Sequence, residues 1–247
     1  MSVAGGSGVL YLMCSLSIFL AFLQMASIKG GAGRKRETKT GDLQDRTVGA
    51  AIKFIWRTKV LFCTMSLDLL AGFFGGAIAL MPVYAKDLLH VGSLGLGSLR
   101  SAPEAGALLM GFIFAQGRPP RHTGKLFILA ILGFGVSSIA FGLSRFFWLS
   151  LLSLFVIGAL DAISVLVRQT LLQVKTPDPL LGRVSALSRV FIGISNEMGE
   201  FESGLTAWLW GPVLSVVLGG IVTVVSTLAV ALFWPKILEL DGLHRSA

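Results

Sequence analysis

The hydrophobic positions of the chain fall into seven long runs, and one long polar interval separates the first run from the other six. Most of the runs approach or exceed the roughly 20 residues that a helix needs to cross a bilayer. The pattern therefore predicts an all-α, polytopic membrane protein, a helical bundle with about seven transmembrane helices. The predicted spans cover residues 9–27, 60–84, 99–114, 126–143, 147–172, 184–210 and 212–234.

The polar interval, residues 29–59, divides the chain unequally. Its second half, from Val48, mixes apolar and basic residues at helical spacing, which is typical of an amphipathic helix lying along a membrane surface. We therefore predict four parts along the chain. They are a single transmembrane helix (1–28), a basic cytoplasmic loop with an amphipathic segment (29–59), a six-helix transmembrane bundle (60–235) and a cytoplasmic tail (236–247).

The distribution of basic residues predicts the orientation of the spans. Lys and Arg that flank membrane spans are retained in the cytoplasm, and the polar interval is the most basic part of the chain. With that interval inside, eighteen of the 21 Lys and Arg lie in inner segments and three in outer ones. No basic segment precedes the first run, so we expect a span there rather than a cleaved leader. The chain should be a multi-pass protein of the cell membrane with a cytoplasmic C-terminus.

The composition agrees with a membrane protein and argues against several other classes. Hydrophobic residues make up 54% of the chain and charged residues only 14%. The net charge of +8 is concentrated between apolar runs, so we interpret it as a topology signal and a source of lipid contacts, not as a nucleic-acid surface. The 2 Cys and 3 His are too few and too scattered for a disulfide framework or a metal site, and no cofactor is expected.

Several charged residues fall inside the predicted spans. A charge at the middle of a bilayer costs roughly 2.5–3.5 kcal/mol on insertion scales, so each needs a partner or a wet cavity. Asp161 and Arg168 share one helix face but lie about 10 Å apart along the axis, so each should meet a neighbouring helix. We take five residues as candidates for a proton or substrate pathway: Asp68, Asp161, Arg168, Glu197 and Glu200.

The last two of these candidates form a pair. Glu197 and Glu200 are three residues apart, so their side chains should face together, with Ser203 and Gly204 continuing the stripe. Two close carboxylates in a medium of low dielectric repel each other, which makes the pair a candidate for binding a proton. The alternative for any intramembrane carboxylate, Asp68 above all, is an interhelical link that only holds the bundle together.

Three stretches resemble the C-terminal half of a major facilitator superfamily transporter, in the branch of bacterial drug and siderophore exporters. They are residues 68–92, residues 97–111, and the run from Arg168 through Thr176-Pro177-Asp178-Pro179 and Gly182-Arg183-Val184 to Glu200. The resemblance implies the six helices of that half plus one preceding helix, with substrate bound between two halves near the bilayer midplane. It also implies an inner gate, for which the candidates are Arg121, Lys125 and Arg183.

The resemblance implies a secondary active exporter of small molecules that works by alternating access, with proton antiport, present here as a C-terminal portion. The alternative is a truncated, non-transporting membrane protein, or a scaffold half that needs a separately encoded N-terminal half or self-association. An enzyme is not expected. Gly5-Gly6-Ser7-Gly8 fits the pattern of membrane serine proteases, but it precedes the first span and no span contains a histidine that could act as base.

Overall fold

A computed structural model describes residues 15, 16, 19, 23, 48–117 and 123–234. Contacts divide the chain into two units, Met1–Leu43 and Gln44–Ala247, and every element described below belongs to the second. Ser15, Leu16, Phe19 and Leu23 are helical, but the rest of the predicted first helix lies outside the described residues. So do most of the basic loop and the tail.

Within residues 48–117 and 123–234 every regular element is helical, which confirms the all-α class. A π-helical turn, Tyr84–Leu88, follows α4. The α-helices are α2 (Val48–Arg57), α3 (Lys59–Phe74), α4 (Met81–Val83), α5 (Ser93–Gln116), α6 (Thr123–Leu143), α7 (Phe147–Lys175), α8 (Asp178–Trp210) and α9 (Pro212–Phe233).

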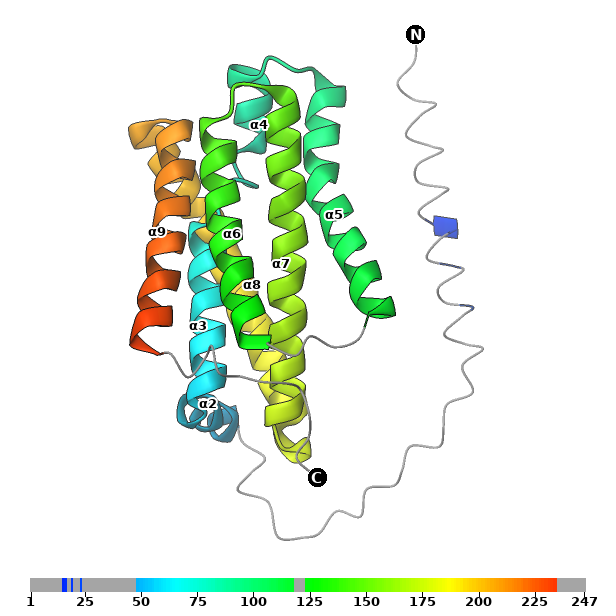
Figure 1. Cartoon of the computed structure of the whole chain (residues 1–247), viewed down its shortest axis with the longest axis vertical. Helices are drawn as coiled ribbons and strands as arrows, with labels where there is room; N and C mark the ends of the chain where they lie inside the picture. The colour runs from blue at the N-terminus through cyan, green and yellow to red at the C-terminus, as the bar shows by residue number, and fades with distance from the viewer. Residues whose placement is uncertain (1–14, 17–18, 20–22, 24–47, 118–122, 235–247) are drawn as a thin grey trace. The chain divides into compact units, whose positions relative to one another are not determined.

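The long helices run up and down in alternation and form one bundle (Figure 1). Helix α6 lies between α7 and α9, α5 packs along α7, and α8 packs on α3 and α9. Helix α2 lies crosswise at the end where α3 begins, and α4 lies at the other end (Figure 1). Helices α3, α6 and α8 all start at the same end of the bundle, beside α2 (Figure 1).

Two clusters of buried apolar side chains hold the bundle. One lies toward α2 and includes Leu61, Phe127 and Leu172. The other lies toward α4, where the Tyr84 ring stacks on Phe141 with centroids 4.5 Å apart. The Tyr84 hydroxyl donates a hydrogen bond to the Gly142 carbonyl oxygen at 2.9 Å, which fixes the segment after α3 to the end of α6.

The second predicted span, 60–84, is wrong as a single helix. Helix α3 ends at Phe74, and residues 75–80 form a turn before α4. Gly75 and Gly76 have low helix propensity, and Pro82 follows within two turns. At Gly76 an added Cβ would overlap the Ser203 side chain of α8, so a residue larger than glycine would not fit at this position of the turn.

Three of the described helices are long and apolar enough to cross a membrane on their own: Thr123–Leu143, Phe147–Lys175 and Pro212–Phe233. These match the predicted spans 126–143, 147–172 and 212–234 to within three residues. Helix α3, with 16 residues, is shorter than a full span. Helices α5 and α8 are longer, with 24 and 33 residues, but polar and small residues interrupt their apolar sequence. These helices contribute the charged residues of the bundle interior together with α7.

Candidate functional site

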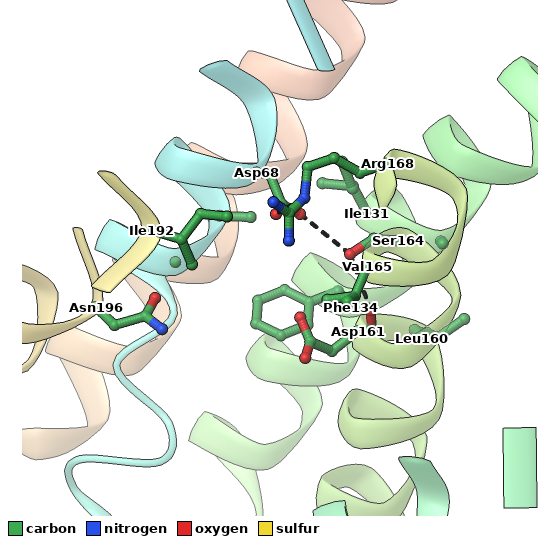
Figure 2. A pocket seen from close by; sticks show the side chains of 13 residues that line it. Asp68, Ile131, Phe134, Leu160, Asp161, Ser164, Val165, Arg168, Ile192 and Asn196 are labelled. Atoms are coloured by element: carbon green, nitrogen blue, oxygen red, sulfur yellow. Dashed lines mark hydrogen bonds and ion pairs between the residues drawn. The ribbon is translucent and has the colours of Figure 1, made fainter. Parts of the chain in front are cut away.

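The centre of the site is an ion pair between two helices. Arg168 of α7 places its Nε 2.7 Å from Oδ2 of Asp68 on α3, and the two side chains are only 3% and 9% exposed. Arg168 Nη1 also donates a hydrogen bond to Ser188 Oγ of α8 at 3.1 Å. One guanidinium therefore connects three helices, as Figure 2 shows for α3 and α7.

Ser164, one turn before Arg168 on α7, completes the surroundings of Asp68. Its Oγ lies 3.1 Å from Asp68 Oδ1 and 2.9 Å from the carbonyl oxygen of Asp161. A hydroxyl has one proton to donate, so the two hydrogen bonds compete. Bonding to the Asp68 carboxylate stabilises its charged form, and this contact adds to the attraction of Arg168.

One cavity is lined by the ion pair, and a second cavity shares lining residues with the first. The smaller, of about 120 Å³, is lined by the ion pair itself and by Asp161, Ser164, Phe134 and Asn196, among others (Figure 2). The larger, of about 330 Å³, is lined by Glu104, Asp161, Asn196 and Glu200 together with small and apolar residues of α3, α5 and α7. Asp161 and Asn196 line both, so the two cavities meet at these residues.

Asp161 differs from Asp68 in its surroundings. Within the bundle its side chain is exposed, whereas Asp68 is buried. Figure 2 shows Asp161 on α7 and Asn196 on α8 on opposite sides of the pocket. Asp161 is therefore a carboxylate that faces open space beside a buried ion pair, which is the arrangement that a group exchanging protons or contacting a cation requires.

Glu197 and Glu200 lie three residues apart on the continuous helix α8, but only one of them lines a cavity. Both residues are exposed; Glu200 lines the larger cavity, and Glu197 lines neither of the two. Helix α8 buries Ser195, Gly199 and Ser203 against its neighbours. Glu197 lies about 200° around the helix from Ser195 and from Gly199, so it points away from that contact. The role of Glu197 and Glu200 as a proton-binding pair stays a prediction.

Two of the three inner-gate candidates belong to the described residues, and both lie at the end of the bundle next to α2. Lys125 is exposed in the first turn of α6, and Arg183 is partly buried near the start of α8. Arg121 lies outside the described residues. Their role as a gate stays a prediction.

Ser164, Ser188, Asn196 and Glu104 were not among the site residues predicted from the sequence. A signal for the α8 residues existed, because Ser188, Ser195 and Ser203 recur at helical spacing and mark the face that meets α3 and α7. The cavity lining by Glu104 depends on how α5 packs on α7, which no local pattern contains. Among the described residues, no three His, Cys, Asp or Glu side chains come together to hold a metal ion.

Comparison with known proteins gives three informative relatives, while no family model matches the chain. An MFS-type transporter of Bacillus subtilis is 26% identical over 155 residues, which cover 63% of this chain and 36% of the relative. An enterobactin exporter of Citrobacter koseri is 29% identical over 140 residues (56% and 33%). An enterobactin exporter of Shigella flexneri is 32% identical over 129 residues (50% and 30%).

The chain spans about a third of the length of the curated relatives it matches. These relatives are transporters and not enzymes. Together with the all-α bundle and its three long apolar helices, they identify this chain as a membrane protein. The resemblance to major facilitator superfamily transporters, and to the C-terminal half of the enterobactin exporters among them, is thereby confirmed.

Proposed function

We propose that the chain forms part of a secondary active transporter that exports small molecules in exchange for protons by alternating access. The observation that carries the proposal is the buried Asp68–Arg168 ion pair, which lines a cavity that shares Asp161 and Asn196 with a second, larger one. A buried ion pair adds little net stability compared with apolar packing, and ionisable residues inside membrane bundles usually mark ion or substrate pathways.

Proton binding would act on the contacts of Arg168. The guanidinium holds α3 through Asp68 and α8 through Ser188. A proton on Asp68 would cancel the charge that attracts Arg168 and would free Ser164 to donate to the Asp161 carbonyl instead. Asp161, which faces the cavities, would pass protons between them and the ion pair. Protonation would thus loosen α3 from α7, as a change between inward-facing and outward-facing states requires.

The larger cavity suggests what kind of substrate to test. Its lining combines apolar and small residues with Glu104, Asp161 and Glu200. An amphipathic small molecule fits this lining, and its carboxylates suit one that carries positive charge. Enterobactin is the other substrate to test, because it appears in the names of two relatives.

The orientation proposed from the sequence agrees with where the described basic residues lie. The end of the bundle beside α2 carries Lys53, Arg57, Lys59, Lys125, Lys175 and Arg183, whereas Lys86, Arg100 and Arg145 lie toward the other end. We propose that the α2 end is cytoplasmic, in a multi-pass protein of the cell membrane whose C-terminus is also cytoplasmic.

Glu197 stays a candidate proton site only if another bundle covers its face.

A second function deserves a test because of the outer face of α8. Phe191, Met198 and Phe201 are exposed on this helix, and both cavities have walls from one bundle only. A non-transporting scaffold, or a half that needs a separately encoded N-terminal half or a second copy, would explain this face.

Flux through the full chain in proteoliposomes separates the two functions. With a pH gradient imposed, the transporter proposal expects movement of enterobactin or of the lipophilic cation ethidium, and expects the movement to stop when nigericin collapses the gradient. Flux that appears only when a separate N-terminal half is co-reconstituted would favour the second function. Absence of flux under both conditions would refute the transporter proposal.

A further inference from the structure

Only part of the apolar surface of helix α2 packs against the rest of the bundle. Ala51 and Ile55 are 0% and 6% exposed and belong to the apolar cluster shared with α3 and α8. Val48, Ile52 and Trp56 are 58%, 38% and 69% exposed. These three recur every four residues, so they form a second stripe next to the buried one. Part of the apolar surface of α2 is thus left outside the bundle.

The face that adjoins this open stripe is basic. Lys53 and Arg57 are exposed on α2, and Lys59 is exposed at the start of α3. No acidic residue occurs between Val48 and Leu67 to neutralise them. A lipid leaflet with anionic headgroups has apolar acyl chains beneath a negatively charged surface. An apolar stripe beside a row of cations complements such a leaflet.

Contacts at the junction of α2 and α3 fix the position of the exposed apolar stripe relative to α3. The Trp56 ring lies 5.4 Å from the Phe62 ring in the first turn of α3. The Thr58 amide donates to the Phe54 carbonyl at 2.9 Å and the Phe62 amide donates to the Thr58 carbonyl at 3.0 Å, so hydrogen bonds continue through the bend. Tryptophan favours the boundary between headgroups and acyl chains. Trp56 therefore lies at the junction of the two helices, where α2 is crosswise to α3 (Figure 1).

We propose that α2 and the start of α3 form a binding site for anionic phospholipid. Val48, Ile52 and Trp56 enter the boundary of the acyl chains, while Lys53, Arg57 and Lys59 contact phosphates. Basic residues beside an apolar stripe, in a chain that already crosses the membrane, favour lipid over a soluble partner. The proposal depends on membrane insertion and not on transport, so a failed flux assay leaves it standing.

Spin-label accessibility tests the placement of the stripe. The full chain, with Cys14 and Cys63 replaced by alanine, is labelled at Ile52→Cys or Lys53→Cys and reconstituted in nanodiscs of phosphatidylcholine and phosphatidylglycerol. The label at position 52 should be more accessible to oxygen than to a water-soluble nickel chelate, and the label at position 53 should show the reverse. Preferential access of the nickel chelate to position 52 would overturn the proposal. Dipolar broadening between position-52 labels would also overturn it, because a second copy would then cover the stripe.

Charge removal tests the lipid preference. The measured quantity is the ratio of phosphatidylglycerol to phosphatidylcholine retained by the purified full chain in native mass spectrometry. Each basic residue near an anionic surface contributes roughly fivefold, so K53Q/R57Q should lower the ratio by at least about tenfold. K86Q removes an exposed lysine at the other end of the bundle and should leave the ratio within about twofold. An unchanged ratio in K53Q/R57Q, or an equal fall in K86Q, would overturn the proposal.

Discussion

Arg168 is the residue on which the interior of the bundle depends most. Its side chain is 3% exposed and contacts an acid on α3 and a hydroxyl on α8. A buried charge without a partner is costly. Removing either the guanidinium or the Asp68 carboxylate alone should therefore lower stability far more than replacing both with uncharged groups. This asymmetry makes the pair testable by removing one partner and then both.

We expect R168M to destabilise the protein by about 3–5 kcal/mol, because Asp68 then remains buried and unpaired. D68N/R168M removes both charges and should recover much of that loss. The measurement is denaturant unfolding of the purified full chain in detergent.

R145M is the matched control, because Arg145 is exposed in the turn between α6 and α7, and its effect should stay within about 0.5 kcal/mol. If D68N/R168M were as unstable as R168M alone, the ion pair would not be the source of the effect.

At this scale the sequence identified which residues need partners, but not the partners themselves. Asp68 and Arg168 could be selected because charges inside apolar runs are costly, and the expectation that Arg168 meets a neighbouring helix is confirmed. Their pairing joins positions 100 residues apart and follows from how α3 packs beside α7, which the spacing along one helix cannot contain. The spacing could not tell which of Glu197 and Glu200 lines a cavity, because the burial of α8 is set by its small residues and not by its acids.

Among the helices, α8 shows most clearly how small residues position the site. A Cβ added at Gly199 would lie 2.5 Å from the Phe73 carbonyl oxygen and 2.8 Å from the Gly72 carbonyl oxygen, both on α3. The backbones of α3 and α8 therefore approach closely one turn from Asn196. Ser188, about three turns before Gly199 on the same helix, accepts the hydrogen bond from Arg168.

We expect G199A to destabilise the bundle by about 1–3 kcal/mol, because the added methyl group pushes α8 away from α3. The same substitution at Gly193 or Gly204, on the same helix, meets nothing within 4 Å. There alanine should be neutral or stabilise by up to about 1 kcal/mol, since it favours the helix over glycine. Thermal unfolding of the three variants in one detergent provides the comparison, and equal losses in all three would contradict the account.

Helix positions were more predictable than helix interruptions. The apolar runs located α6, α7 and α9 because each run is uniform and ends at a polar or Gly-Pro turn. The break after α3 lies inside an apolar run, where hydrophobicity alone predicts a continuous helix. Gly75-Gly76 carried the local signal, but the packing of Gly76 on Ser203 becomes visible only once α3 and α8 are side by side.

For the whole molecule, the charges and the cavities support the same function. Basic residues gather at one end of the bundle, while acidic residues of α3, α5, α7 and α8 surround the interior cavities. The sequence predicted the first pattern because it depends only on span order. It did not predict the second, since Glu104, Asp161 and Glu200 come together only through the packing of three helices.

The measurement that tests the central claim most directly is proton-driven flux through the full chain carrying D161N. Asp161 is the cavity-facing carboxylate of the proposal, and the amide keeps its size while removing its ability to carry a proton. D87N, an exposed carboxylate in the π-helical turn, is the matched control. The account predicts that D161N abolishes movement of enterobactin or ethidium driven by a pH gradient, while D87N retains it and both proteins stay folded. Unchanged proton-driven flux in D161N would contradict the account.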